Sequence, residues 1–449
     1  MPEESRRAAD RHAPTEPGGP GRIVTEEASG KTTVPANNNQ KTVDASKKSQ
    51  EPLSGYAKLC LALLVLAGFS LGVSEFIVVG IQQQLADAYG ISLSDAGQFM
   101  SIFAVAYAVS TPLLALTTGR FKRYHLLVAY SAVFIAGNLL AMAASSFGGM
   151  LAGRILIGLV SGSVLAVEVT FIPEFLDARR TPFVISIIYA AFSLAMVLST
   201  SLGKLAAELL TWRVALVGAF ILSVAVSVAL IVVLPKTGNT DAPSTMREQL
   251  PYLLDRRVLS GMMVFTFGAG SVYVFYGYIT PYLQDVLGVA PVATSVVLMF
   301  YGAVCMASNL LSGWLAGRFG MKALLATFPL QALFMLGLFL ADGSQTVGIT
   351  FIMLIALTMY LMSTPCIAMF MDVGQNDYPQ ALTLAASIEP MSFNIGIAFG
   401  TAVGGAVING PGMHFAGLFG GTFSLLACAF VALSLRFTKQ ARTKRTPWE

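Results

Sequence analysis

Residues 313–322 read GWLAGRFGMK, and residues 115–124, nearly half a chain earlier, read ALTTGRFKRY. Both stretches share the Gly-Arg-Phe core, carry further basic residues after it, and lie between two long apolar runs. A charged loop repeated at corresponding places in an apolar chain indicates a duplicated membrane protein. Two parallel six-span halves, each with such a loop after its second span, form an arrangement in which one half can rock against the other.

The composition of the chain agrees with a membrane protein. Hydrophobic residues make up 55% of the 449 residues, charged residues make up 12%, and the mean hydropathy is +0.70. Charged residues normally make up about a quarter of a soluble domain, so most of this chain is expected to lie in lipid. The net charge of +4 comes from basic residues scattered among the apolar runs, which argues against nucleic-acid binding.

No catalytic or cofactor-binding motif is found in the sequence. The four cysteines lie in apolar segments without CxxC spacing, and the three histidines lie in the N-terminal region or at the edges of apolar runs. Neither an HExxH motif, nor a His/Cys cluster, nor a Ser/His/Asp set, nor a P-loop can be assembled from them. We therefore expect no enzyme activity, no cofactor and no metal, and any transport is expected to be secondary rather than driven by ATP.

Twelve windows of the chain are long and apolar enough to cross a bilayer, which takes about 20 residues. The expected spans are 57–81, 96–118, 125–146, 149–173, 181–206, 212–234, 259–283, 292–316, 322–341, 346–371, 380–406 and 413–436. The first window begins too far from the N-terminus for a cleavable signal peptide, so the first span is expected to stay in the protein.

The spans divide the chain into five expected parts. These are a disordered cytoplasmic tail (1–55), an N-terminal six-helix bundle (56–234), a cytoplasmic linker (235–258), a C-terminal six-helix bundle (259–436) and a cytoplasmic C-terminal tail (437–449). The polar N-terminal tail has no apolar run to bury, and a docking segment is the alternative. The linker contains either a short amphipathic surface helix or no regular structure.

The distribution of basic residues predicts the orientation. Loops on the same side as the N-terminal tail carry most of the Lys and Arg residues, whereas the opposite loops and their flanks carry only Lys204 and Arg213. Cytoplasmic loops are enriched in Lys and Arg, so both termini are predicted to be cytoplasmic.

Four motifs occur in a characteristic order between residues 57 and 436. They are the two copies of the charged loop, Arg154–Gly162 (RILIGLVSG), Trp212-Arg213 and Phe393–Gly400 (FNIGIAFG). They resemble the gating motif, the RxxxGxxxG motif of the fourth span, the GWR motif and the NxGxxxG stretch of the major facilitator superfamily. Within it the chain is similar to the twelve-span drug and sugar proton antiporters, typified by bacterial arabinose-type efflux permeases. The resemblance implies an all-α membrane protein with twelve transmembrane helices in two pseudo-symmetric six-helix bundles.

Two departures from the family pattern affect what can be expected. Gly119 and Gly317 stand where the gating motif has its acidic residue, so a carboxylate–arginine latch is not available there. The Gly-Pro kink of the antiporter motif in the fifth span is replaced by residues 197–203 (VLSTSLG), which leaves other coupling modes open. The loops are then expected to close the cytoplasmic gate by docking on helix ends. The residues expected to do so are Arg120, Lys122, Arg123, Arg318 and Lys322.

Four ionisable side chains fall inside the expected spans: Glu75, Arg154, Glu168 and Glu389. A charged side chain at the centre of a span costs roughly 2.5–3.5 kcal/mol. These groups must therefore face one another, water or substrate, or the carboxyl groups must take up a proton. Three carboxylates against one arginine favour protons or cationic substrates over anions.

Glu75 and Arg154 are expected to lie at one depth. Each lies roughly 10 Å from the outer end of its helix, and both helices line the cavity in the resembled family. We hypothesise a switchable ion pair in which Glu75 accepts a proton in one access state. The alternative is that the pair only fixes the orientation of the two helices.

Glu168 and Glu389 are expected to be further proton or cation sites. Glu168 shares a helix face with Arg154, although it could instead reach the cytoplasmic interface. Glu389 precedes Pro390, which can bend the helix and free a carbonyl group. The alternative for Glu389 is a neutral acid held by a neighbouring Asn or Ser.

Three residues are expected to contact substrate. Tyr276 lies in the aromatic run 271–282 and is expected to stack on a substrate ring, because ligand pockets are mostly apolar with a few placed polar groups. Asn309 and Asn394 carry amides that need partners at lipid depth, and either substrate or another helix can supply them.

These features together predict a proton-coupled exporter of small neutral or cationic compounds such as sugars, nucleosides or drugs. It is expected to act as a monomer in a bacterial inner (plasma) membrane, with a small-molecule substrate, protons and lipid as its partners. Uptake by symport or facilitated diffusion with the same fold is one alternative. A non-transporting membrane receptor or scaffold is another.

Overall fold

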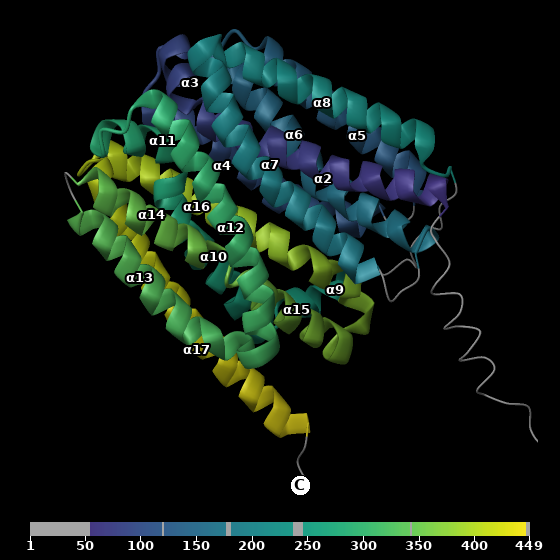
Figure 1. The fold of residues 1–449 in the computed structure, drawn as a ribbon. Coiled ribbons are helices and arrows are strands. Elements are labelled where there is room, and N and C mark those ends of the chain that lie inside the picture. Colours follow the sequence, from purple (N-terminus) through teal and green to yellow (C-terminus); the bar gives the residue numbers. More distant parts are fainter. Residues whose placement is uncertain (1–53, 119–120, 177–180, 237–245, 342–343, 446–449) are drawn as a thin grey trace, which may run out of the picture. The chain divides into compact units, whose positions relative to one another are not determined.

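The computed structural model describes residues 54–118, 121–176, 181–236, 246–341 and 344–445. Within these ranges the chain forms helices and their connections, without a β-strand (Figure 1). Nearly all of the predicted N-terminal tail, together with Arg120 of the first charged loop, lies outside the described residues.

The N-terminal half contains six helices of membrane length. They are α2 (Gly55–Gly80), α4 (Leu93–Thr118), α5 (Arg123–Ala143), α6 (Phe147–Phe171), α7 (Thr181–Leu209) and α8 (Trp212–Val233). The short α3 (Gln82–Tyr89) follows α2, and a 3-10 turn, η1 (Ile172–Glu174), ends α6. Each long helix corresponds to one of the first six predicted spans.

The C-terminal half is less regular. Its long helices are α10 (Arg256–Tyr276), α12 (Pro291–Phe319), α13 (Leu324–Leu340), α14 (Gln345–Met359), α15 (Ser363–Asp377), α16 (Leu382–Asn409) and α17 (Ala416–Arg445). The short elements are α9 (Met246–Leu253), α11 (Ile279–Pro281), η2 (Tyr282–Val286), which is a π-helix, and the 3-10 turns η3 (Gly320–Ala323), η4 (Pro379–Ala381) and η5 (Met413–Phe415).

Eleven helical segments among the described residues are long and apolar enough to cross a membrane. One of them, Pro291–Leu340, is 50 residues long and contains two helices, because the chain turns at Gly320 with φ +55. Glycine adopts that left-handed conformation without a steric penalty. Another segment, Gln345–Asp377, is a single crossing made of α14 and α15. The predicted all-α fold with twelve transmembrane helices is thus confirmed.

The helices of each half pack mainly on one another. In the N-terminal half α2 packs on α7 and α8, and α6 packs on α4 and α5; in the C-terminal half α10 packs on α16 and α17. The two halves meet along two helix pairs, α4 with α16 and α7 with α12, which lie between the outer helices in Figure 1. Such close packing uses small residues: a Cβ atom on Gly158 would lie 2.5 Å from the Phe103 carbonyl oxygen.

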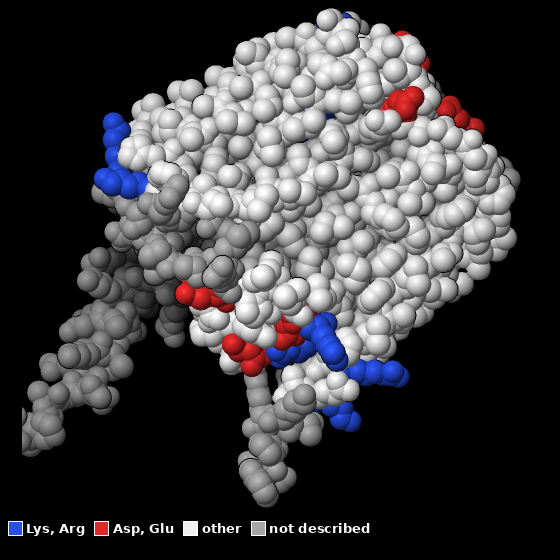
Figure 2. Space-filling model, turned by 180° about the vertical axis from the view of Figure 1, so that it is seen from behind, with Lys and Arg blue, Asp and Glu red and all other residues white. Residues whose placement is uncertain are grey.

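Most exposed charged side chains on the face shown in Figure 2 lie towards two ends of the molecule. A broad, mostly white band with very little Lys, Arg, Asp or Glu separates these two ends. Large apolar side chains such as Leu310 and Val232 are 80% and 72% exposed. Exposed apolar surface of this extent marks the region in contact with lipid.

The linker between the halves contains a helix, α9, that is attached to the C-terminal half. The Tyr252 hydroxyl donates to the Phe370 carbonyl oxygen at 3.1 Å, and its ring lies 5.8 Å from that of Tyr378. The Gln380 amide donates to the Glu248 carbonyl oxygen at 3.2 Å. Of the two alternatives for the linker, the structure contains the short helix, at Met246–Leu253.

Asp255 begins α10 and holds a small ionic cluster at the same place. The Asp255 carboxylate accepts hydrogen bonds from the backbone N–H of Arg257 at 2.8 Å and from the Arg257 guanidinium at 2.6 Å. It also accepts a hydrogen bond from the Tyr378 hydroxyl at 3.3 Å. Arg257 also pairs with Asp377 at 2.7 Å. Burial raises the pKa of Asp255, but the hydrogen bonds and charge of Arg257 outweigh it and hold this pKa below its usual 3.8.

We expect Asp255→Asn to lower the free energy of unfolding by about 1–2 kcal/mol at pH 7, because asparagine keeps the helix cap but loses the charge. A carboxyl group with a lowered pKa in the folded state stabilises above its unfolded pKa, and loses that effect as the pH falls through the folded value. Denaturation of both proteins should therefore show a difference at pH 7 that disappears below about pH 3. Asp285→Asn, at an exposed carboxyl, is the control and should change little; an equal loss in both variants would contradict this role.

Candidate functional site

Arg154 lies buried inside the N-terminal half and binds three backbone carbonyl groups. Its Nε–H donates to the Phe99 oxygen at 2.9 Å, Nη1 donates to the Ser74 oxygen at 2.6 Å, and Nη2 donates to the Glu75 oxygen at 2.9 Å. The guanidinium carbon lies 4.5 Å from the centroid of the Phe103 ring. Because these partners belong to α2 and α4, Arg154 ties α6 to both helices.

Glu75 lies beside Arg154, but the two side chains do not form a direct ion pair in this conformation. Glu75 is 2% exposed and Arg154 is 1% exposed, and the two charges interact electrostatically. None of the ion pairs among the described residues joins these two side chains. The structure thus brings the predicted partners to one depth, while the guanidinium uses its donors on helix carbonyls. A switch between the two side chains stays a prediction.

Glu389 of α16 faces the same region from the other half. Tyr107 of α4 and Tyr360, at the end of α14, each interact electrostatically with both Glu75 and Glu389. Tyr189 of α7 interacts with Glu389 as well. One carboxyl group from each half therefore borders a shared group of tyrosine side chains.

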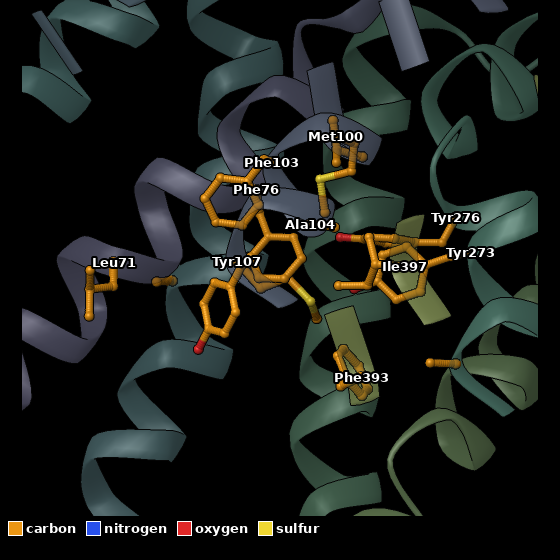
Figure 3. Close-up of a cluster of buried hydrophobic side chains, with 14 of the residues drawn as sticks. Leu71, Phe76, Met100, Phe103, Ala104, Tyr107, Tyr273, Tyr276, Phe393 and Ile397 are labelled. Atoms are coloured by element: carbon orange, nitrogen blue, oxygen red, sulfur yellow. The ribbon is translucent and has the colours of Figure 1, made fainter. Parts of the chain in front are cut away.

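Aromatic rings from the two halves meet in this region. Figure 3 shows Phe76, Phe103 and Tyr107 on the N-terminal side, and Tyr273 and Tyr276 on the C-terminal side. We use the name central tyrosine cluster for five residues of the C-terminal half: Tyr273, Tyr276, Tyr301, Tyr360 and Phe393.

Two ring pairs of the central tyrosine cluster are stacked. Tyr276 and Tyr301 lie 5.2 Å apart with an interplanar angle of 18°, and Tyr360 and Phe393 lie 5.6 Å apart at 11°. Tyr273 meets Phe393 edge-on at 6.0 Å. Such contacts fix the orientation of several large rings at once.

A break in the tenth crossing positions Tyr360. The helix stops after α14 and resumes with α15, and two serines of α12 bind the freed backbone groups. The Ser308 hydroxyl accepts the Tyr360 N–H at 3.0 Å, while the Ser312 hydroxyl donates to the Leu361 carbonyl oxygen at 3.1 Å. Pro365 has no N–H to offer that oxygen, so Ser312 replaces the missing helix bond. Transporters commonly place binding sites at such interrupted helices.

Tyr301 and Tyr360 are not among the site residues predicted from the sequence. A tyrosine within an apolar span carries no charge that would mark it as costly, so hydropathy alone does not single it out. The available signal was Pro365, which follows the break by a few residues and predicts a helix interruption.

Glu168 is buried in the N-terminal half. It is 1% exposed, and neither carboxyl oxygen has a hydrogen-bond partner among the described residues. The structure therefore places it within the protein rather than at the cytoplasmic interface. A buried carboxyl group without a partner is stable as the neutral acid or with a bound cation.

The three expected substrate contacts differ in their surroundings. Tyr276 belongs to the central tyrosine cluster and is 1% exposed. The Asn309 amide donates to the Ser193 hydroxyl at 3.2 Å and so joins α12 to α7. The Asn394 amide donates to the Pro390 carbonyl oxygen of its own helix at 3.0 Å, and its own side-chain oxygen has no partner among the described residues. Contact with substrate stays a prediction for all three.

The charged loops lie at helix ends. Arg123 donates from Nη1 to the Thr170 carbonyl oxygen at 3.1 Å, close to the C-terminus of α6, where a cation is favourable. Lys122 precedes α5, Arg318 lies in the last turn of α12 and Lys322 lies in η3. Their part in gating stays a prediction.

A twelve-helix membrane protein with ionisable side chains between two corresponding halves has the construction of a secondary transporter. A family model described as Major Facilitator Superfamily matches residues 64–382. The chain belongs to the major facilitator superfamily, as its motifs indicated, and is a transporter of that family rather than a member of an enzyme class.

Relatives and a solved structure agree with this assignment. The chain is 28% identical to the inner membrane transport protein YdhP of Escherichia coli, over 85% of this chain and 97% of YdhP. It is 25% identical to the putative transporter AraJ of E. coli, over 85% and 96% of the two chains. It is also 25% identical to the purine ribonucleoside efflux pump NepI of Shigella sonnei, over 85% and 93%. The crystal structure of a D-xylose-proton symporter has a TM-score of 0.64 at 16% identity, covering 84% of this chain and 97% of that one.

Proposed function

We propose that this transporter is a proton-coupled exporter of small molecules that works by alternating access. The observation that carries the proposal is the pair Glu75 and Glu389, one carboxyl group from each half, around the same tyrosines. The balance between the charged and neutral forms of a carboxyl group depends on its burial, on nearby charges and on its hydrogen bonds. Rocking of the halves would change what each group contacts, and with it the affinity for a proton.

The energetics of a single proton suffice for export. One charge that moves through 100 mV releases about 2.3 kcal/mol, which corresponds to a roughly fiftyfold substrate gradient. Glu168 is proposed as a further proton site, because its buried carboxyl group has no partner among the described residues.

The relatives support the direction and the location. NepI is named as an efflux pump and YdhP as an inner membrane protein. We accordingly propose export across a bacterial inner membrane, by a monomer with cytoplasmic termini. The proposed substrates are sugars, nucleosides or drugs. Uptake is the second candidate, because the structural relative is named as a symporter.

Glu75→Gln and Glu389→Gln test the coupling. In inside-out vesicles with an acidic lumen, wild-type protein should accumulate a radiolabelled probe such as inosine, D-xylose or tetraphenylphosphonium. Each variant should lose this accumulation but keep exchange of the same probe, because exchange needs no net proton movement. Glutamine keeps the shape and removes the exchangeable proton.

Asp87→Asn is the matched control, since Asp87 is an exposed carboxyl group in α3. It should accumulate the probe as the wild type does. Full accumulation by both glutamine variants would remove these carboxyl groups from the coupling. Accumulation only in right-side-out vesicles with external acid would favour the symporter.

A further inference from the structure

Three hydroxyl groups of the central tyrosine cluster lack a good hydrogen-bond acceptor. The Tyr301 hydroxyl donates to the sulfur of Met359 at 3.5 Å, and the Tyr360 hydroxyl donates to the sulfur of Met196 at 3.3 Å. The Tyr273 hydroxyl has no partner among the described residues. A thioether sulfur is only a weak acceptor.

These hydroxyl groups are buried, so bulk water has little access to them. Tyr273, Tyr301 and Tyr360 are 0%, 1% and 9% exposed. Folded proteins pair the large majority of buried polar groups, and three weakly paired donors in one cluster need an explanation. A ligand that brings its own oxygen or nitrogen acceptors would supply the missing partners.

The surroundings of these donors describe the rest of that ligand. The cluster contains two stacked ring pairs, and Figure 3 shows Ile397 and Met100 in the same buried cluster as Tyr273 and Tyr276. Flat apolar surface of this kind favours a planar ring over a saturated one.

We infer that the central tyrosine cluster binds a neutral, planar heteroaromatic compound of the nucleoside type, by ring stacking and by hydrogen bonds from the tyrosine hydroxyls. This inference rests on the proposed function, because it names the substrate class of that same site. The ligand is neutral because the nearby carboxyl groups are assigned to protons. The bond from Tyr360 to Met196 also joins the two halves, so an acceptor that replaces Met196 would release that contact.

Binding is tested with purified full-length protein in lipid nanodiscs. The probes are inosine, D-xylose and tetraphenylphosphonium, and the readouts are thermal stability and equilibrium binding of radiolabelled probe. Inosine should raise the melting temperature in a concentration-dependent way, because a ligand that binds only the folded state stabilises it. The other two probes should not.

Tyr301→Phe and Tyr360→Phe test the donors. Each change keeps the ring and removes the hydroxyl, and each should weaken inosine binding by about five- to tenfold. Tyr89→Phe is the matched control, since its hydroxyl donates to the Ala144 carbonyl oxygen at 3.2 Å outside the cluster. Tyr89→Phe should bind inosine as the wild type does.

Separate outcomes decide the inference and the proposed function. Absence of inosine binding, binding of only D-xylose or tetraphenylphosphonium, or wild-type affinity in both cluster variants overturns the inference. Inosine binding that depends on Tyr301 and Tyr360 supports it. If that binding occurs but a pH gradient drives no inosine movement, the substrate class stands and proton-coupled transport fails.

Discussion

Arg154→Ala is expected to lower the free energy of unfolding by about 3–5 kcal/mol, the largest loss predicted for a single side chain of this protein. The change removes three charge-assisted hydrogen bonds, to the carbonyl oxygens of Ser74, Glu75 and Phe99. It also leaves a void where a fully buried side chain packed against Phe103. Thermal or detergent-induced unfolding of purified protein measures the effect.

Arg213→Ala provides the matched control for this experiment. Arg213 also lies over an aromatic ring, that of Trp212 at 4.2 Å, and donates to one carbonyl group, that of Ala144 at 3.4 Å. It is exposed, so its removal should cost less than about 1 kcal/mol. Arg154→Lys should lower the free energy of unfolding by an amount between those of the two alanine variants, because an ammonium group cannot bind three carbonyl groups as the planar guanidinium does. Equal stability of the two alanine variants would show that the carbonyl contacts contribute little.

Gly97→Val is expected to disfavour the conformation described here. The population of molecules in which the two halves touch near Gly97 should fall by about tenfold or more. Tyr278, between α10 and α11, inserts its ring into a socket formed by three glycines. A Cβ atom on Gly97 would overlap the Tyr278 hydroxyl, one on Gly404 would lie 2.9 Å from its ring, and one on Gly405 would lie 2.8 Å from its hydroxyl. The hydroxyl also donates to the Thr401 carbonyl oxygen at 3.1 Å.

The socket closes one end of the contact between the halves, the end that the predicted orientation makes extracellular. Gly97 belongs to α4 and the other two glycines belong to α16, so Tyr278 seats between helices of both halves. Thr280 makes a second link there, with its hydroxyl donating to the Val79 carbonyl oxygen at 3.2 Å. Valine at position 97 should exclude the ring and favour separation of this end. Transport should fall with it, since the proposed alternating access needs both states.

Spin labels at positions 87 and 285 measure the separation, and their distance distribution should lengthen in Gly97→Val. Gly218→Val is the control, because a Cβ atom at Gly218 meets nothing within 4 Å. Tyr278→Ala added to Gly97→Val should restore the short distance if the clash is the cause. An unchanged distribution in Gly97→Val would rule out the socket as a closing contact.

Much of the fold could be predicted because a bilayer imposes a length on every apolar helix. Most predicted spans end within a few residues of the observed helices. The exceptions are informative. The window 346–371 covers the break at Tyr360, because residues on both sides of the break are apolar and hydropathy does not register a missing N–H. The last helix continues to Arg445, past the predicted end at 436, since a helix can run beyond the lipid with polar residues.

The candidate site could be predicted only in part. Glu75, Arg154 and Glu389 stood out because a charge in lipid is costly. Counting residues along a helix gives a depth but not a partner, so the choice of backbone oxygens by Arg154 could not be foreseen. The ring contacts of Tyr276 with Tyr301 and of Tyr360 with Phe393 join residues far apart in the chain, and they depend on the geometry of several helices.

Main-chain oxygens have the same chemistry whatever side chain they accompany. Arg154 donates to the backbone carbonyl oxygen at position 75 and not to the carboxyl group. A substitution of the side chain at this position therefore leaves that hydrogen bond in place. Under the proposed coupling, one substitution at position 75 would therefore remove dependence on a proton gradient while the hydrogen bonds of Arg154 persist.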